Sequence, residues 1–208
     1  MSLHRQRILD QADRLFRSGG FRSVSLDAIV EAAETTKTTF YKHFRSKDDL
    51  ALTCLNNACR QWWTWVDGRM AEIAPQGPRQ RIRTFFLLLG EYLKPSQEGR
   101  FLAFSACVEY PEPHDPCHIA GRENLQALEG RLRIWATEAR ASDPSALAVQ
   151  LAVIAKGAII CEIANRDGTA GEIAARLAQE LMEQVLGPAV PIVTTELTCS
   201  PTSEPAET

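Results

Sequence analysis

The sequence lacks the long hydrophobic runs that would place it in a membrane or direct its export. Uninterrupted apolar stretches such as Phe85–Leu89 and Ala158–Cys161 are far shorter than the roughly 18–20 residues of a membrane span. The first 20 residues carry charges every few positions and lack the apolar core of a signal peptide. With 45% hydrophobic and 24% charged residues, the composition is that of a globular chain. We therefore expect a cytoplasmic protein with no membrane partner.

The sequence also lacks a disulfide framework and the motifs of common enzyme sites. Its six cysteines are irregularly spaced in a chain long enough to build its own core, which favours a reducing compartment. A glycine-rich phosphate loop, a G-x-S-x-G element and a helix with two histidines and a glutamate are all missing. We predict that the protein is not an enzyme and needs no cofactor.

One segment, residues 109–118, concentrates groups that are able to bind a metal. His114, Cys117 and His118 could coordinate zinc together with a carboxylate, but their spacing is not an established ligand pattern. The prolines in this segment favour a stiff connector between helices, and we predict no metal site. A metal-sensing switch built on this segment stays an alternative, as does a small all-helical enzyme.

Acidic residues slightly outnumber basic ones, but the charges are unevenly distributed. The formal net charge is -3, which by itself disfavours a nucleic-acid partner. Residues 1–47 nevertheless hold nine Lys and Arg against five Asp and Glu, a net charge of +4, while the rest of the chain carries −7. A basic N-terminal segment on an acidic body suggests contact with a polyanion at one end only.

Apolar residues recur at spacings of three to four almost throughout, without the strict alternation that is typical of strands. This pattern predicts an all-α fold of about nine helices, with glycine and proline at several helix limits. Ser25, Thr36 and Ser46 are expected to cap the helices that follow them. The first helix ends at the glycines of positions 19 and 20. The others are expected over 26–33, 37–44, 47–73, 79–93, 100–108, 118–141, 144–165 and 171–186.

Three short helices in the first 47 residues, the last two joined by a very short turn, are typical of a helix-turn-helix. In that motif the last helix enters the major groove of DNA, and the preceding one crosses the phosphate backbone. At about 100° per residue, Phe40 and Phe44 share the inward face of this last helix, and Thr38, Thr39 and Lys42 lie opposite. The outward face therefore offers hydroxyls, methyls and an amine but no acid, which suits base edges and phosphates.

Residues 7–50 resemble the DNA-binding domain of the TetR/AcrR family of bacterial repressors. The resemblance is carried by Ile8, Leu9, Ala12, Leu15 and Phe16; by Gly20, Phe21, Val24, Ser25 and Ile29; by Ala32 and Ala33; and by Thr36, Lys37, Thr39, Phe40, Tyr41, His43, Phe44, Ser46, Lys47 and Leu50. Beyond this segment the helices match the family in number, length and order.

The resemblance implies which residues contact DNA. Together with Lys42 from the outward face, they are Ser25, Thr36, Lys37, Thr38, Thr39, Tyr41, His43 and Lys47. One position departs from the family pattern, because Glu34 occupies a turn position where glycine is usual. If its backbone is left-handed, a side chain there costs on the order of 1 kcal/mol.

The resemblance also implies a two-fold homodimer that reads a near-palindromic DNA operator through paired half-sites. The last two helices would form the four-helix interface, although a single-chain core would explain their apolar stripes equally well. The candidate interface residues are Leu147, Leu151, Ile154, Ala158, Leu177, Leu181 and Val185.

In the family, the helical body binds a small molecule and shifts the spacing of the two DNA-binding units. We therefore predict a ligand-responsive repressor that an unidentified effector releases from its operator. Residues 1–47 would bind DNA, 48–186 would bind ligand and dimerise, and 187–208 would form a disordered tail, since they hold four prolines and no Lys or Arg. Candidate pocket residues are aromatic or polar side chains on apolar helices: Trp62, Trp65, Phe86, Leu89, Phe104, Glu109, Arg122, Trp135 and Glu162.

Overall fold

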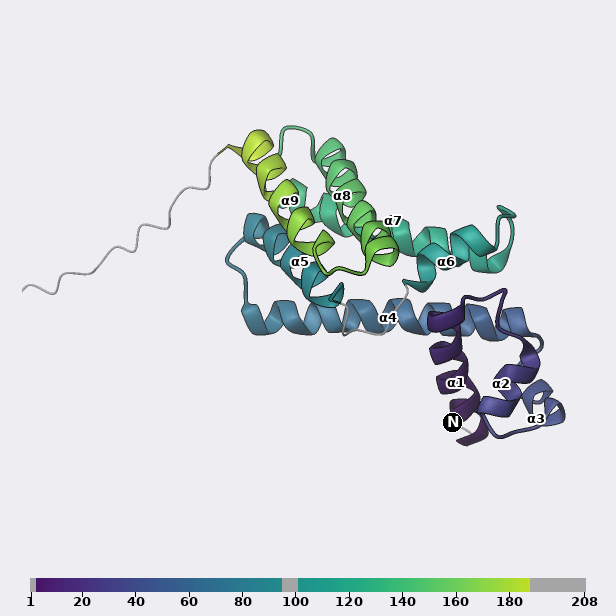
Figure 1. Ribbon diagram of the computed structural model, residues 1–208. Helices are drawn as coiled ribbons and strands as arrows, with labels where there is room; N and C mark the ends of the chain where they lie inside the picture. The colour runs from purple at the N-terminus through teal and green to yellow at the C-terminus, as the bar shows by residue number, and fades with distance from the viewer. Residues whose placement is uncertain (1–2, 95–100, 188–208) are drawn as a thin grey trace, which may run out of the picture.

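The computed structural model describes residues 3–94 and 101–187, and within these ranges the chain forms nine α-helices and no strand (Figure 1). The predicted all-α class is confirmed. The helices are α1 (Leu3–Gly19), α2 (Leu26–Ala32), α3 (Lys37–Tyr41), α4 (Lys47–Ile73), α5 (Pro78–Tyr92), α6 (Leu102–Glu109), α7 (Pro116–Glu138), α8 (Pro144–Asn165) and α9 (Ala170–Leu186). The predicted tail at 187–208 lies outside the described residues, except for Gly187.

Short polar residues begin the N-terminal helices, as the sequence predicts. The hydroxyls of Ser25, Thr36 and Ser46 accept hydrogen bonds of 3.0–3.1 Å from backbone amides three residues further on. These bonds satisfy amides that have no partner within the helix. The helices α5, α7 and α8 begin with proline, whose fixed φ suits a first turn, and α7 and α8 are also capped by the carboxylates of Asp115 and Asp143.

The helix α3 is shorter than the predicted 37–44, because its regular part ends at Tyr41. The chain continues in a tightened turn, in which the His43 amide donates to the Phe40 carbonyl at 2.9 Å. Such i to i−3 bonds are common where a helix ends. Phe44 still reaches the interior and is 3% exposed, so the predicted inward face is kept.

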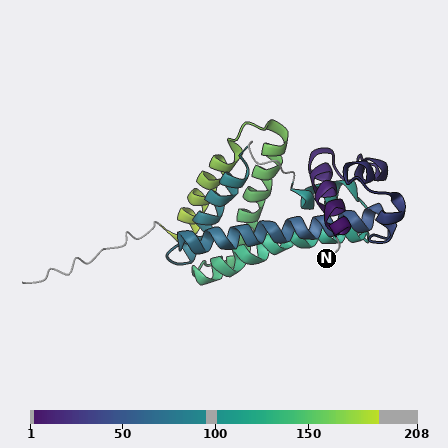
Figure 2. The same ribbon diagram turned by 90° about the horizontal axis from the view of Figure 1, so that it is seen from below.

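The long helix α4 connects the two halves of the molecule (Figures 1 and 2). Its first half packs with α1, α2 and α3 in a unit that we call the head, and its second half lies along the body, α5 to α9. The core of the head includes residues of α4 as far as Leu55, together with residues of α6 and α7. A second core, which begins with Val66 on α4, fills the body. By packing, the two units therefore meet inside α4, whereas the division at residue 47 stays a prediction.

Two glycines allow α5 and α9 to approach closely in the body. A Cβ placed on Gly171 would lie 2.4 Å from the Cα atom of Gly90, a distance at which no side chain fits. The close backbone approach holds α9 against α5 and leaves the outer side of α9 exposed.

By length and composition alone, α8 could cross a membrane. In the fold it packs against α7 and α9, with eight of its residues buried. A buried core helix of a protein that is not in a membrane can have the same length and composition, so these two properties are weak evidence for a membrane span. The helix owes its high hydropathy to having two apolar sides: one is buried, and the other exposes Val149, Val153 and Ile160.

Candidate DNA interface and ligand cavity

The turn between α2 and α3 is closed by backbone bonds that require a left-handed residue. The Thr35 amide donates to the Val30 carbonyl at 3.0 Å, and the Glu34 amide donates to the Glu31 carbonyl at 2.9 Å. This pattern is the Schellman motif, in which glycine usually occupies the left-handed position. Glu34 occupies it here with φ 46°, so the condition stated for this turn position is met. Its carboxylate pairs with Arg7 of α1 at 2.5 Å.

The helix α3 is anchored by one side and exposes the other. Phe40 is completely buried, and Phe44 packs against it with ring centroids 5.6 Å apart. On the opposite side Thr38 and Lys42 are exposed, and Tyr41 is 56% exposed. The exposed side therefore presents a hydroxyl, an amine and a phenol, all of which donate hydrogen bonds to DNA acceptors.

Other predicted DNA contacts are already engaged within the head. The ammonium of Lys37 lies 2.6 Å from a carboxylate oxygen of Asp27, and this hydrogen bond raises the pKa of Lys37. Both side chains are exposed, so the pair is weak and a phosphate could compete for the lysine. Thr36 and Thr39 share a 3.1 Å contact between their hydroxyl oxygens. His43 is half-buried.

Lys47 has a structural role in addition to its predicted one. Its ammonium donates to the carbonyls of Phe21 at 3.0 Å and Val24 at 2.9 Å, and so ties the loop between α1 and α2 to the start of α4. Ser25 is exposed and uses its oxygen as the cap of α2, while its hydroxyl hydrogen stays available to a phosphate. DNA contact by either residue stays a prediction.

The head is joined to the body through Arg22. Its backbone amide donates to the Glu109 carboxylate at 2.7 Å, and its Nε donates to the Glu109 carbonyl at 3.1 Å. Its guanidinium also covers the ring of Tyr110, 4.4 Å from the centroid. The Tyr110 hydroxyl donates to Asp48 of α4 at 3.0 Å, and burial raises the pKa of this phenol. We call these four residues the junction.

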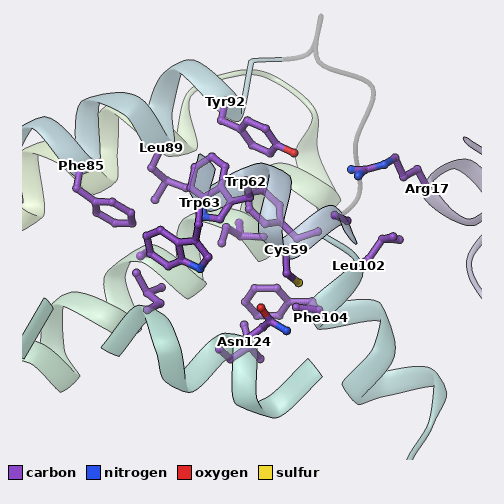
Figure 3. A pocket seen from close by; sticks show the side chains of 17 residues that line it. Arg17, Cys59, Trp62, Trp63, Phe85, Leu89, Tyr92, Leu102, Phe104 and Asn124 are labelled. Carbon is purple, nitrogen blue, oxygen red and sulfur yellow. The ribbon is translucent and has the colours of Figure 1, made fainter. Parts of the chain in front are cut away.

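A cavity lies inside the body, between α4, α5, α6, α7 and α8 (Figure 3). The volume that the centre of a water molecule can occupy in this cavity is about 60 Å³. Three of the predicted pocket residues line it: Trp62, Leu89 and Phe104.

The other predicted pocket residues do not line this cavity, each for a packing reason. Trp65 stacks on Trp62, with centroids 5.4 Å apart, and Phe86 is buried in the core against Phe85. Trp135 lines a separate surface hollow beside Met70. Three assignments of polar residues are wrong for this cavity: Glu109 belongs to the junction, Arg122 is exposed, and Glu162 accepts a bond from the Gly168 amide at 3.0 Å.

The structure adds lining residues that the sequence analysis missed. Aromatic ones are Trp63, Phe85, Tyr92 and Phe101, and polar ones are Arg17, Cys59 and Asn124. Adjacency to Trp62 was a usable signal for Trp63. Nothing in the sequence pattern pointed to Arg17, because it belongs to α1 of the head and reaches the cavity only through the fold.

The thiols and histidines near these sites show no reactive arrangement among the described residues. Burial raises the pKa of Cys59 to about 12, so this residue lines the cavity as a neutral thiol. The sulfur of Cys117 lies 3.7 Å from the Asp48 carbonyl, and His118 Nδ1 lies 2.7 Å from the Tyr110 carbonyl. His114 is exposed. Within the described ranges no three His, Cys, Asp or Glu side chains are grouped to hold a metal.

Three of the four predicted interface residues on α8 are inside their own chain and are not available to a partner. Leu147, Leu151 and Ala158 are buried in the core of their own chain, at 1%, 0% and 7% exposed. Ile154, Leu181 and Val185 are half-buried and pack against the same core. Leu177 of α9 is 43% exposed and stays a candidate. The other apolar residues exposed on α8 and α9, which together with Leu177 we call the outer face, are Val149, Val153, Ile160 and Ile173.

Comparison with known proteins agrees with this architecture. Residues 8–54 match the family model described as bacterial regulatory proteins, tetR family. Over 180 residues the chain is 21% identical to the HTH-type transcriptional regulator YjdC of Escherichia coli, covering 86% of this chain and 94% of that protein. Over 46 residues it is 50% identical to the HTH-type transcriptional regulator AcrR of Shigella flexneri, covering 22% of this chain and 21% of AcrR.

The fold is shared with solved structures along most of its length. SCO4454, a TetR-family transcriptional regulator from Streptomyces coelicolor, superposes with a TM-score of 0.81 at 23% identity, covering 88% of this chain and 96% of that one. Sequence identity is therefore higher over the 46 residues shared with AcrR than over the long match to YjdC, while the helix arrangement of SCO4454 extends along most of the chain.

Proposed function

The chain belongs to the TetR family of bacterial transcriptional regulators, and on that premise we propose that it is a cytoplasmic, dimeric repressor that a small molecule releases from its DNA operator. The exposed side of α3 carries the DNA-binding part of the proposal. It is held by Phe40 and Phe44 and presents Thr38, Tyr41 and Lys42 to the outside. A helix supported in this way fits the major groove.

The response to a ligand is supported by the position of the cavity. Phe104 near the start of α6 lines the cavity, and Glu109 at its end bonds to the head through Arg22. A molecule that enlarges the cavity pushes on α6. Through the bond between Glu109 and Arg22, α6 holds the loop between α1 and α2. The metal-sensing alternative is not favoured, because Cys117 and His118 are each directed to a backbone carbonyl.

Gel-shift titration on the DNA upstream of the protein's own gene tests the proposal. Tyr41→Ala and Lys42→Ala should each weaken binding by about tenfold or more, because each removes a donor to phosphate or base. Both side chains are exposed, so helicity measured by circular dichroism should not change. Affinity should also fall steeply with salt.

Arg133→Ala is the matched control, since Arg133 is an exposed cation on α7 of the body. It should bind DNA like the unmodified chain. If both α3 variants retain full affinity, the assignment of α3 as the recognition helix is refuted.

A further inference from the structure

The polar groups of the cavity define what it accepts. Most lining side chains are aromatic or aliphatic, among them Trp62, Trp63, Phe85 and Phe104. The polar side chains are Arg17, Tyr92, Asn124 and Cys59, and none of the described lining residues is Asp or Glu. The cavity is therefore mainly apolar, and among the described lining residues Arg17 supplies the positive charge.

That cation comes from the head, not from the body. Arg17 lies in the last turn of α1, and Figure 3 shows its side chain extending toward the cavity opposite the hydroxyl of Tyr92. The side chain is only 16% exposed, and its Nε donates to Asp13 at 2.7 Å. Burial lowers the pKa of Arg17, but its bonds to Asp13 and Tyr92 raise it more, so the net shift is upward. The guanidinium stays charged, and it carries five N–H donors, more than its bonds to Asp13 and Tyr92 use.

The size of the cavity limits the ligand. One water needs roughly 10–15 Å³ of the volume that water centres can occupy. The cavity offers about 60 Å³ of this volume, which is enough for about four to six waters. With a share of liquid volume of about 30 Å³ per water, this corresponds to roughly 120–180 Å³ of molecule. A molecule with a single aromatic ring has this volume.

We propose that the effector is a small aromatic acid whose ring lies between the indoles and phenyl rings of the body and whose carboxylate pairs with Arg17 of the head. The inference rests on the proposed function and names the ligand class of its cavity. Arginine binds carboxylates through two parallel N–H donors. The pairing places the ligand's charge directly on α1, so occupancy acts on the head as well as on α6.

A cationic ligand fits the same rings less well. Aromatic cages attract cations through their ring faces, but Trp63 already has the guanidinium of Arg131 4.1 Å from its centroid. The guanidinium of Arg17 disfavours a second cation, and the carboxylate of Asp13 that partly neutralises it is not among the lining residues. The charge of the ligand is therefore the property to test.

The test uses the purified full chain and three probes of one shape: benzoate, benzamide and benzylammonium. Trp62 and Trp63 line the cavity, so quenching of tryptophan fluorescence reports binding. Benzoate should bind about tenfold or more tightly than benzamide, the difference expected for a charge-assisted hydrogen bond. Arg17→Gln should abolish this preference by lowering the affinity for benzoate to about that for benzamide, and unchanged helicity by circular dichroism shows that the variant folds.

Arg14→Gln is the matched control, because Arg14 is an exposed arginine on α1 whose side chain bonds to Gln11. It should keep the preference for benzoate. Equal affinity for benzoate and benzamide, tighter binding of benzylammonium, failure of benzoate to bind, or a preference that survives Arg17→Gln would each overturn the inference. Because these titrations contain no DNA, their outcome is independent of the gel shift that tests the proposed function.

Discussion

At the scale of single residues, Glu34 combines two effects that are separable by substitution. Its left-handed backbone, φ 46°, costs a non-glycine residue on the order of 1 kcal/mol. Its carboxylate lies in the turn immediately before α3 and pairs with Arg7. The first effect concerns the stability of the head, and the second concerns the charge near the DNA-facing helix.

Glu34→Gly should raise the free energy of unfolding by up to about 1 kcal/mol, partly offset by the greater freedom of glycine in the unfolded chain. Glu34→Gln keeps the strained backbone and loses an exposed ion pair of little value, so its stability should be nearly unchanged. Both variants remove a negative charge beside α3, and both should bind DNA more tightly in a gel shift. Thermal unfolding measures the first difference. Equal stabilisation by the two substitutions would show that backbone strain is not the cause.

The residues that were hardest to predict are those whose role depends on distant parts of the chain. Periodicity correctly placed Phe40 and Phe44 inside and Thr38 and Lys42 outside, because these positions depend on the geometry of one helix. Arg17 and Glu109 could not be placed in this way. One reaches from the head to the cavity and the other from the body to the head, and no local pattern encodes either contact.

At the scale of helices, the close approach of α5 and α9 gives an asymmetric prediction. A Cβ on Gly171 would lie 2.4 Å from the Cα of Gly90, whereas a Cβ on Gly90 would lie 3.4 Å from its nearest neighbour, the carbonyl carbon of Gly171. Gly171→Ala should therefore destabilise the chain by about 1–3 kcal/mol, the cost of overpacking a core. Gly90→Ala should have a clearly smaller effect.

Gly130→Ala is the control, because Gly130 lies within α7 and a Cβ there meets nothing within 4 Å. It should stabilise the chain by up to about 1 kcal/mol through helix propensity. Denaturant unfolding followed by circular dichroism gives all three values. If Gly171→Ala proves as stable as the unmodified chain, the close approach of α5 and α9 is not required.

Helix positions were predictable from the sequence because capping and periodicity act within a few residues. The hydroxyls of Ser25, Thr36 and Ser46 occupy the caps that the sequence indicated. The exposed face of α8 was not predictable, since the helix has apolar residues on both sides. Leu147 and Leu151 form one stripe and Val149 and Val153 another, and spacing alone cannot tell which stripe faces the core of the chain.

At the scale of the whole molecule, the outer face of α8 and α9 sets the expected oligomer. Val153 is 62% exposed and Ile160 is 48% exposed on α8, and Ile173 and Leu177 are 45% and 43% exposed on α9. Exposed apolar residues gathered on two neighbouring helices are typical of a protein interface. A single head presents one short recognition helix, and pairing two heads supplies the second half-site.

We therefore expect a sedimentation mass of twice 23.1 kDa for the unmodified chain and a monomer for Val153→Asp, because a carboxylate buried at the interface has no partner. The monomer should keep its helicity, since Val153 lies on the surface of its own chain. It should lose DNA affinity, because a single head cannot bind two half-sites together.

Val108→Asp, at a position 76% exposed on α6, introduces the same charge away from the outer face and should stay dimeric. Leu151→Asp should instead unfold the chain, as Leu151 is fully buried. A Val153→Asp variant that remains dimeric would place the interface elsewhere on the body.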